Sequence, residues 1–195
     1  MGVFIIYKLV EKIYDIFKKV VLKEKLRKAF YQHPKRIIVG SDFEFNMFNN
    51  IVNIDQTAKI EIGNSVHFRN FCNIWVDKNS TLNLGSNVFF NNYCSINALG
   101  KISIGDYSIF GENVKLFDHN HLYLDTSIPI QFQGCKIGEI TIGRNCWIGS
   151  NVIILKNVNI GDNVVIGAGN LIYKDVPSNV IIKSQTNYLS HEYRK

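Results

Sequence analysis

Large apolar residues recur at every sixth position over most of the chain from residue 62 onward. Gly directly follows eight of them, and a small residue stands four positions later in most units. A period of six fits neither an amphipathic helix nor a single alternating strand. It predicts a solenoid of triangular cross-section, in which each unit forms one short strand and one corner. The fifteen large positions are Ile62, Phe68, Ile74, Leu84, Phe90, Ile96, Ile104, Phe110, Leu116, Ile142, Ile148, Ile154, Ile160, Ile166 and Ile172.

Three of the four cysteines fall on the small position of this repeat. Cys72, Cys94 and Cys146 each stand four residues after a large apolar residue. We interpret them as small core side chains rather than as metal ligands or nucleophiles. Cys135 lies outside the repeat and has no assigned role. The Gly that follows a large residue indicates a tight backbone or a positive φ at that corner.

One interruption breaks the regular spacing. The step from Leu84 to Ile104 is 20 residues, whereas the step from Ile104 to Ile142 is 38. About 18 residues are therefore extruded from one coil, and we expect this loop to span residues 119–138. Loops that leave a rigid scaffold often carry function. The sequence Asp118-His119-Asn120-His121 marks the point where the loop leaves.

The charge of the chain is concentrated at its N-terminus. The formal net charge is +6, and residues 1–36 hold ten Lys and Arg against three acidic residues, a net of +7 that leaves −1 for the rest. The main body therefore gives no electrostatic indication of a nucleic-acid groove, and we expect no nucleic-acid partner. No apolar stretch is long enough to span a bilayer, and no secretory signal is evident. We expect a cytoplasmic protein with reduced cysteines.

Residues 1–36 differ in kind from the rest. Their apolar residues have helical spacing with lysines between them, which predicts a basic amphipathic helical extension that ends near Pro34. Such a helix could lie on the anionic inner face of a membrane, or it could pack on the solenoid as a lid. Residues 37–181 are expected to form the solenoid, beginning with an irregular coil, and residues 182–195 a C-terminal tail.

The repeat resembles that of the hexapeptide-repeat acetyltransferases. The similarity covers about residues 54–181, including 110–114, 145–149 and 165–177, and is strongest to maltose, galactoside and nodulation-type O-acetyltransferases. The resemblance implies an all-β, left-handed parallel β-helix. It also implies a homotrimer that transfers an acetyl group from acetyl-CoA to a sugar hydroxyl, in surface-polysaccharide synthesis. No metal is expected.

The resemblance also assigns roles at the acceptor end. His121 stands where this family has its catalytic histidine, and as a general base it would remove the hydroxyl proton during attack on the thioester. Asn91, one coil earlier, matches an acceptor-binding Asn that could also assist the oxyanion. Trp147 matches a pocket Trp. Asp118 could orient an imidazole or cap a turn, and His119 is the rival base.

The matching acetyl-CoA positions lie near the C-terminal end of the repeat. Main-chain groups on the rigid strands would hold the pantetheine amides, and Lys174 would meet a phosphate. After Val180 the chain departs from the family, because a Gly-x-Pro-Ala segment is absent. The tail's contact with the adenine end is therefore not carried over. The matching positions are Gly149, Ser150, Gly167, Ala168, Tyr173 and Lys174.

Other functions are compatible with the same fold. A sugar N-acetyltransferase would act on an amine, which needs less help from a base. A γ-type carbonic anhydrase would need three histidines on one metal, and only His67, His119 and His121 lie within the coils. His67 is two coils from the other two. A non-catalytic scaffold would not explain why His121, Asn91 and Trp147 occur together.

Overall fold

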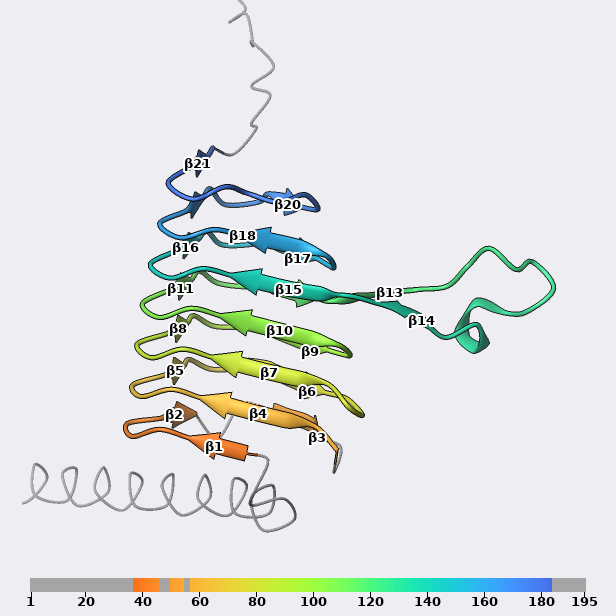
Figure 1. The fold of residues 1–195 in the computed structure, drawn as a ribbon, viewed down its shortest axis with the longest axis horizontal. Helices are drawn as coiled ribbons and strands as arrows, with labels where there is room; N and C mark the ends of the chain where they lie inside the picture. Colours follow the sequence, from red (N-terminus) through yellow and green to blue (C-terminus); the bar gives the residue numbers. More distant parts are fainter. Residues whose placement is uncertain (1–36, 46–49, 55–56, 184–195) are drawn as a thin grey trace, which may run out of the picture.

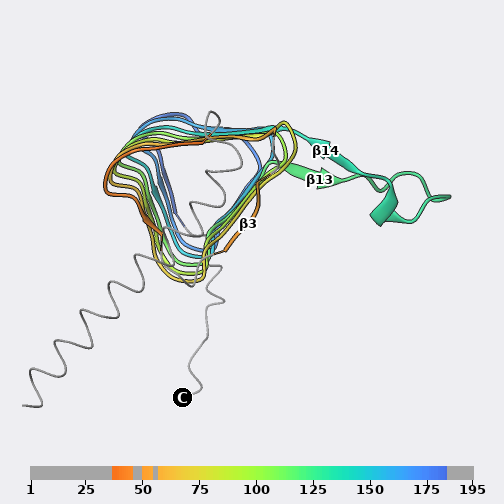
Figure 2. The same cartoon turned by 90° about the horizontal axis from the view of Figure 1, so that it is seen from below.

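The polypeptide winds into a prism of six stacked coils, whose three walls are parallel β-sheets (Figures 1 and 2). The computed structural model describes residues 37–45, 50–54 and 57–183. The helix expected in residues 1–36, and residues 184–195 of the tail, lie outside the described residues. Within the described part of the chain, no helix is long and apolar enough to cross a membrane.

Each of the six coils contributes one strand to each wall, and β21 (Ile181–Ile182) adds a seventh strand to sheet B. Sheet A is formed by β1 (Ile37–Val39), β4 (Lys59–Ile62), β7 (Thr81–Leu84), β10 (Lys101–Ile104), β15 (Glu139–Ile142) and β18 (Val158–Ile160). Sheet B is formed by β2 (Glu44–Phe45), β5 (His67–Phe68), β8 (Phe89–Phe90), β11 (Ile109–Phe110), β16 (Trp147–Ile148), β19 (Val165–Ile166) and β21 (Ile181–Ile182). Sheet C is formed by β3 (Asn50–Ile54), β6 (Asn73–Val76), β9 (Ser95–Ala98), β12 (Lys115–Phe117), β17 (Ile153–Leu155) and β20 (Leu171–Ile172).

The coil is left-handed. In Figure 1 the strands of sheet A run leftward at the front, and the chain returns rightward behind them while it rises toward the C-terminal end. This winding is opposite to the usual right-handed crossover between parallel strands. The all-β, left-handed parallel β-helix expected from the sequence is thereby confirmed.

The interior is filled by the residues that the period of six selects. All fifteen large positions are buried, and the small positions occupied by Cys72, Cys94 and Cys146 are at most 1% exposed. The paired strands are in register, so that Phe90 lies directly over Phe68 and under Phe110. Their rings stack at centroid distances of 4.4 Å each. Burial of one continuous apolar column stabilises the stack of coils.

The glycines after the large residues are required by close approach between coils. A Cβ on Gly105 would lie 2.6 Å from the backbone nitrogen of Arg144, one coil above. Positive φ occurs elsewhere, at the residue just before the small position. Among the residues that the structure describes, thirteen non-Gly residues have positive φ, and eight of these are Asn. Of the two alternatives expected at the repeat glycines, the structure therefore shows the tight backbone rather than the positive φ.

The regular coil is interrupted where the sequence predicts it. After β12 the chain leaves the prism as an antiparallel hairpin of β13 (His119–His121) and β14 (Cys135–Ile137), with the 3₁₀ helix η1 (Ile130–Phe132) in its turn. We call residues 119–138 the arm. It projects from the corner between sheets C and A (Figure 2). The first coil is irregular as expected, with a register shift between Ile51 and Asn53.

Candidate functional site

The root of the arm is fixed by a buried carboxylate. Asp118 is 0% exposed and follows β12 directly. Its two side-chain oxygens accept hydrogen bonds from the backbone nitrogens of Leu99 and Gly100, at 2.9 and 2.8 Å, in the coil below. Its own carbonyl accepts from the nitrogen of Gly138 at 2.7 Å, which closes the hairpin. A buried charge needs partners of this kind, so Asp118 caps the corner beneath the arm.

The same carboxylate holds one of the two arm histidines. Nδ1 of His119 lies 3.2 Å from Oδ1 of Asp118, and the His119 side chain is 17% exposed. When Nδ1 donates this bond, the lone pair of the imidazole is on Nε2. Asp118 therefore contacts both the backbone of the corner and the ring of His119.

His121 faces a thiol across the hairpin. His121 pairs with Cys135 in the β13–β14 register, and Nδ1 of His121 lies 3.7 Å from the Cys135 sulfur. His121 is exposed, and Cys135 is half-buried. Sequence reasoning missed this contact. Its only signal was that Cys135 is the one cysteine outside the repeat.

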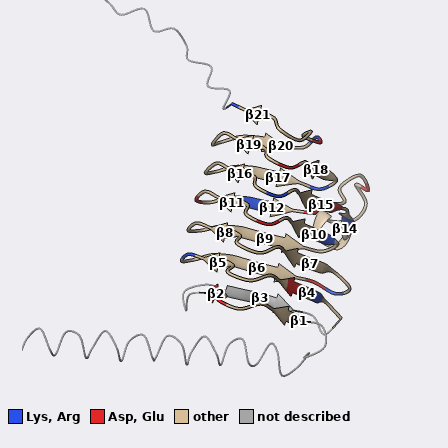
Figure 3. Ribbon diagram, turned by 60° about the vertical axis from the view of Figure 1, so that its left-hand side comes forward, with Lys and Arg blue, Asp and Glu red and all other residues tan. Residues whose placement is uncertain are grey.

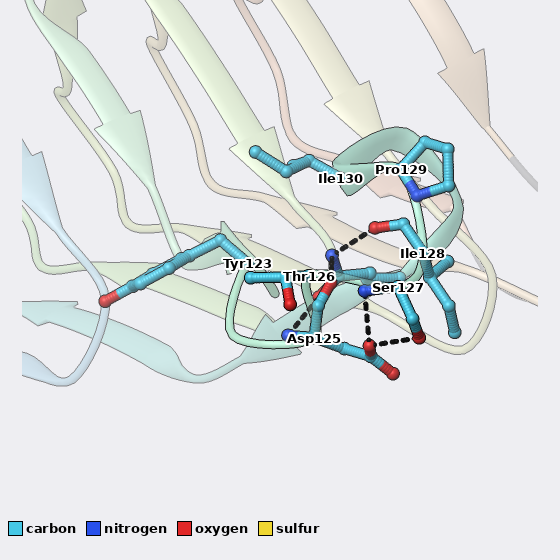
Figure 4. Close-up of a pocket in the computed structure, with 8 residues that line it drawn as sticks. Tyr123, Asp125, Thr126, Ser127, Ile128, Pro129 and Ile130 are labelled. Carbon is cyan, nitrogen blue, oxygen red and sulfur yellow. Dashed lines mark hydrogen bonds between the residues drawn. The ribbon is translucent and has the colours of Figure 1, made fainter.

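The tip of the arm is closed by its own polar groups. Nε2 of Gln133 donates to the carbonyls of Asp125 and Ile128, both at 2.7 Å. Hydrogen bonds from Ser127 hold the pKa of the Asp125 carboxyl below its ordinary value. A shallow pocket of about 420 Å³ lies at this tip, and Figure 4 shows the residues that line it, with Asp125, Ser127 and Ile128 near one another. Exposed apolar residues surround this tip: Leu122, Tyr123, Leu124, Ile128, Ile130 and Phe132.

A second group of expected site residues lies on another corner, between sheets B and C. Asn91 follows β8 and is half-buried. Its side-chain oxygen accepts from the nitrogen of Asn92 at 2.8 Å and is 3.5 Å from Nη1 of Arg69. The amide nitrogen of Asn91 has no such partner among the described residues, so it can donate to a ligand.

Trp147 lies on the outer surface of sheet B, just before this corner. Its side chain is 55% exposed and therefore points away from the core. Trp147 pairs in register with Ile109 and Val165. Ile109 is also exposed, at 45%. The outer face of sheet B therefore carries an apolar column that no described part of the same chain covers.

The positions expected to hold acetyl-CoA are divided between the two corners. Gly149 and Ser150 lie at the corner between sheets B and C, and Ala168 is directly above them, because a Cβ on Gly149 would lie 2.6 Å from the Ala168 nitrogen. Gly167 lies beside Ala168. Tyr173 and Lys174 follow β20, at the corner between sheets C and A, and Nζ of Lys174 is 5.6 Å from the Tyr173 ring centroid.

A single chain does not bring all of the expected site residues together. Asn91, Trp147 and the stacked residues 149–150 and 167–168 lie at or beside the corner between sheets B and C. Asp118, His119 and His121 lie at the corner between C and A, as do Tyr173 and Lys174. The width of sheet C separates the two groups. The sequence repeat shows which residues lie on which corner, but it does not show which corners meet.

Two of the three core cysteines, Cys94 and Cys146, have a raised thiol pKa, whereas a hydrogen bond with Cys94 lowers the pKa of Cys72. Burial raises the pKa of the Cys146 thiol, and a hydrogen bond with Cys72 together with burial raises that of Cys94. A neutral buried thiol is a poor nucleophile. Among the described residues, no group of three His, Cys, Asp or Glu side chains is placed to hold a metal ion.

Charge is interspersed over the coils. Figure 3 shows basic and acidic residues mixed along the edges of the prism rather than gathered on one face. This distribution differs from the basic stripe that marks a nucleic-acid surface.

Comparison with known protein families identifies the repeat. Residues 139–174 match the family model "Bacterial transferase hexapeptide (six repeats)". These residues are therefore similar to the bacterial transferase hexapeptide repeat. The hexapeptide match covers β15 to β20, the coils above the arm.

Curated proteins that are similar to part of this chain include acetyltransferases. The galactoside O-acetyltransferase of Escherichia coli is 44% identical over 85 residues, which are 41% of this chain and 38% of that protein. A putative lipopolysaccharide biosynthesis O-acetyl transferase of Escherichia coli is 30% identical over 94 residues, 45% of this chain and 48% of that protein. The chain thus spans less than half the length of these relatives.

Solved structures with hexapeptide repeats share the fold. An N-acyltransferase from Bacillus cereus, in complex with dTDP and coenzyme A, superimposes with a TM-score of 0.64 at 22% identity and covers 82% of each chain. A hexapeptide-repeat acetyltransferase from Vibrio cholerae has a TM-score of 0.57 at 22% identity, over 64% of this chain and 68% of that one. At this identity the likeness concerns the fold alone.

Proposed function

We propose that this chain is an acetyl-CoA-dependent O-acetyltransferase that acts on a sugar hydroxyl in surface-polysaccharide biosynthesis. The observation that carries the proposal is the pair of arm histidines, which leave the β-helix on the extruded hairpin, at a root fixed by buried Asp118. The names of the curated relatives, galactoside and lipopolysaccharide O-acetyl transferases, support the reaction class and the sugar acceptor.

In this proposal His121 is the general base. A sugar hydroxyl is too weak an acid to ionise at neutral pH, so the base removes its proton as the oxygen attacks the acetyl carbonyl. A hydrogen bond from Nδ1 of His121 to the Cys135 sulfur, 3.7 Å away, leaves the Nε2 lone pair for that proton. The imidazolium then returns the proton to the departing thiolate of coenzyme A. The C–O bond forms, the C–S bond breaks, and the histidine is regenerated.

His119 has a supporting role. Its Nδ1 is engaged by Asp118, which also accepts from two backbone nitrogens. These bonds fix the direction in which β13 leaves the coil and hence the position of His121, two residues further along the same face of the strand. His119 remains the rival base, and separate substitution of the two histidines distinguishes them.

The division of the residues between two corners supports a site built from two subunits. We propose a homotrimer in which the arm of one chain lies beside Asn91 and Trp147 of its neighbour. The exposed apolar residues of the arm and the apolar column on sheet B would then be buried by association. Asn91, through its amide nitrogen, would donate to the acceptor or to the developing oxyanion.

The residues above the arm fit a CoA ligand. Acetyl-CoA supplies the activated thioester. The backbone of Gly149, Ser150, Gly167 and Ala168 forms a rigid edge on which pantetheine amides can be held. Lys174 and Tyr173 are both exposed, at the corner between sheets C and A, where a lysine can pair with a phosphate. In this proposal the reaction takes place in the cytoplasm. Residues 1–36 would bind a membrane surface or pack on the β-helix.

A second candidate is N-acylation of an amino-sugar nucleotide. The fold likeness to the Bacillus cereus N-acyltransferase, solved with dTDP and coenzyme A, motivates it. A deprotonated amine needs little help from a base, whereas a hydroxyl needs a base to remove its proton. The candidate therefore gives His121 a smaller part in the reaction.

One assay separates these functions. The full chain is incubated with acetyl-CoA and, separately, with galactosides, lipopolysaccharide oligosaccharides and dTDP-amino sugars, and products are detected by mass spectrometry. We expect an acetylated glycan whose acetyl group is lost in mild alkali, as an ester is. An alkali-stable product on the amino sugar would favour the second candidate. The absence of acetylated product with every acceptor would contradict both.

A further inference from the structure

Three aromatic residues occupy backbone positions that the fold otherwise gives mainly to Asn. In the described part of the chain, thirteen non-Gly residues have positive φ, and eight of them are Asn. The aromatic exceptions are Phe71, Tyr93 and Tyr107, with φ of 61°, 63° and 61°. Bulky side chains are rare in the left-handed region because Cβ crowds the following carbonyl. The corner backbone therefore does not explain why these residues are aromatic.

Two of the three form an exposed stack on neighbouring coils. Phe71 and Tyr93 follow one another at the corner between sheets B and C, with ring centroids 5.2 Å apart and planes within 10°. They are 45% and 54% exposed. One coil further on, the same corner position is Asn113, whose amide nitrogen donates to Asn151 at 2.8 Å. The aromatic part of this corner thus ends at the coil that carries the arm.

Polar groups suited to sugar hydroxyls lie beside the stack. Asn91 is two residues before Tyr93 on the same corner, and its amide nitrogen can donate to a ligand. The guanidinium of Arg69 is exposed, 5.5 Å from the ring centroid of Phe89 and 3.5 Å from the Asn91 oxygen. A pyranose presents both a C–H face, which packs on an aromatic surface, and hydroxyls, which bind amides and guanidinium groups.

The order of these residues along the prism gives the surface a direction. Asn91 and Tyr93 lie on the third coil, and Phe71 lies on the second. The glycine positions proposed for acetyl-CoA lie on the fifth and sixth coils of the same corner. A sugar held at Asn91 can therefore have its neighbours in a glycan over Tyr93 and Phe71, on the side away from the thioester.

We propose that Phe71 and Tyr93 form an acceptor platform that binds the sugar units adjoining the acetylated one in a glycan chain. The inference rests on the proposed function and narrows its acceptor to an oligosaccharide or polymer rather than a free monosaccharide. The stack is an acceptor-binding surface on each chain, and Arg69 extends it with a hydroxyl-binding charge.

Binding measured by calorimetry tests the platform without requiring catalysis. The probes are methyl β-galactoside against a β-linked galactotetraose, and methyl α-glucoside against maltotetraose. We expect the native chain to bind one of the tetrasaccharides about tenfold more tightly than its monosaccharide, which corresponds to the usual contribution of an aromatic contact. The variant carrying both Phe71→Asn and Tyr93→Asn should bind the two sizes equally.

Tyr107 provides a matched control. It has the same positive φ and is 62% exposed, but it lies at the corner between sheets A and B, away from Asn91. Tyr107→Asn should leave the ratio of affinities unchanged. Asn suits the left-handed backbone, so the melting temperature of the double variant should not fall. A lower melting temperature or a changed oligomer mass in the double variant alone would assign the stack to packing or subunit contact.

The outcomes separate the platform from the proposed reaction. The platform is overturned if the native chain binds monosaccharide and tetrasaccharide equally well, or binds neither. It is also overturned if the double variant still prefers the tetrasaccharide. A size preference that depends on Phe71 and Tyr93, without acetyl transfer to any probe glycan, supports the platform and counts against the proposed O-acetyltransferase.

Discussion

The coils and the arm of this protein follow opposite rules. In the coils, large apolar side chains point inward at every sixth residue and are buried almost completely, as at Phe90, Phe110 and Ile148. In the arm, large apolar side chains such as Leu124 and Phe132 are 84% and 72% exposed. The inward apolar residues of the coils are buried and stabilise the stack, whereas those of the arm are exposed and add little to the stability of the single chain. The two candidate catalytic histidines are on the arm.

The largest expected effect comes from removing the arm. Residues 119–138 can be replaced by Leu-Gly, the two residues that turn the same corner one coil below at Leu99 and Gly100. The capping bonds of Asp118 to that coil would remain. We expect circular dichroism and melting temperature close to native, with acetyl transfer reduced by more than about 100-fold, because His121 is lost. An unfolded armless chain would show that the two regions are not separable.

Glycine substitutions sharpen the same contrast in stability. A Cβ at Gly105 would lie 2.6 Å from backbone atoms that cannot yield without moving a coil, so Gly105→Ala should cost about 2–3 kcal/mol. Gly134, in the arm, has φ +80° and nothing within 4 Å of its added Cβ. Gly134→Ala should cost about 1 kcal/mol of backbone strain. Thermal melts of the two variants measure the difference, and equal losses would contradict it.

The smallest expected effect is the alkaline response of the core thiols. The Cys146 pKa is raised from 9.0 by burial, so the folded chain keeps a proton that the unfolded chain loses. The contribution of Cys146 to the free energy of unfolding is fully present below about pH 9 and declines as the pH rises above it. In Cys146→Val, denaturant midpoints should decline less steeply above pH 9, since Val occupies the same small position elsewhere in the repeat. An unchanged slope would exclude Cys146 as a contributor.

The fold was predictable because the repeat determines it. The inward positions and the arm boundaries follow from spacing alone, since each coil must bury its large residues against the next. The reason why glycine is needed after the large residues was not predictable in the same way. From the sequence, Gly105 could be explained by a need for positive φ. The structure shows instead that the backbone of Arg144 occupies the space that a Cβ at Gly105 would need.

The candidate site was predictable only in part. The register identifies His121, Asn91 and Trp147 as positions outside the core. It does not determine side-chain direction, so it left Asp118 free to orient either histidine, and the structure pairs it with His119. The contact between His121 and Cys135 depends on the hairpin register across the turn of the arm. A repeat pattern contains no information about that register.

The most direct test of the account measures free coenzyme A released from acetyl-CoA in the presence of a glycan acceptor. Native chain, His121→Ala and His119→Ala are compared at equal concentration, with circular dichroism to confirm folding. We expect acceptor-dependent release by the native chain and a loss of about 10²–10⁴-fold in His121→Ala, the usual contribution of a general base. A loss below about tenfold in folded His121→Ala would contradict the assignment of the base to His121.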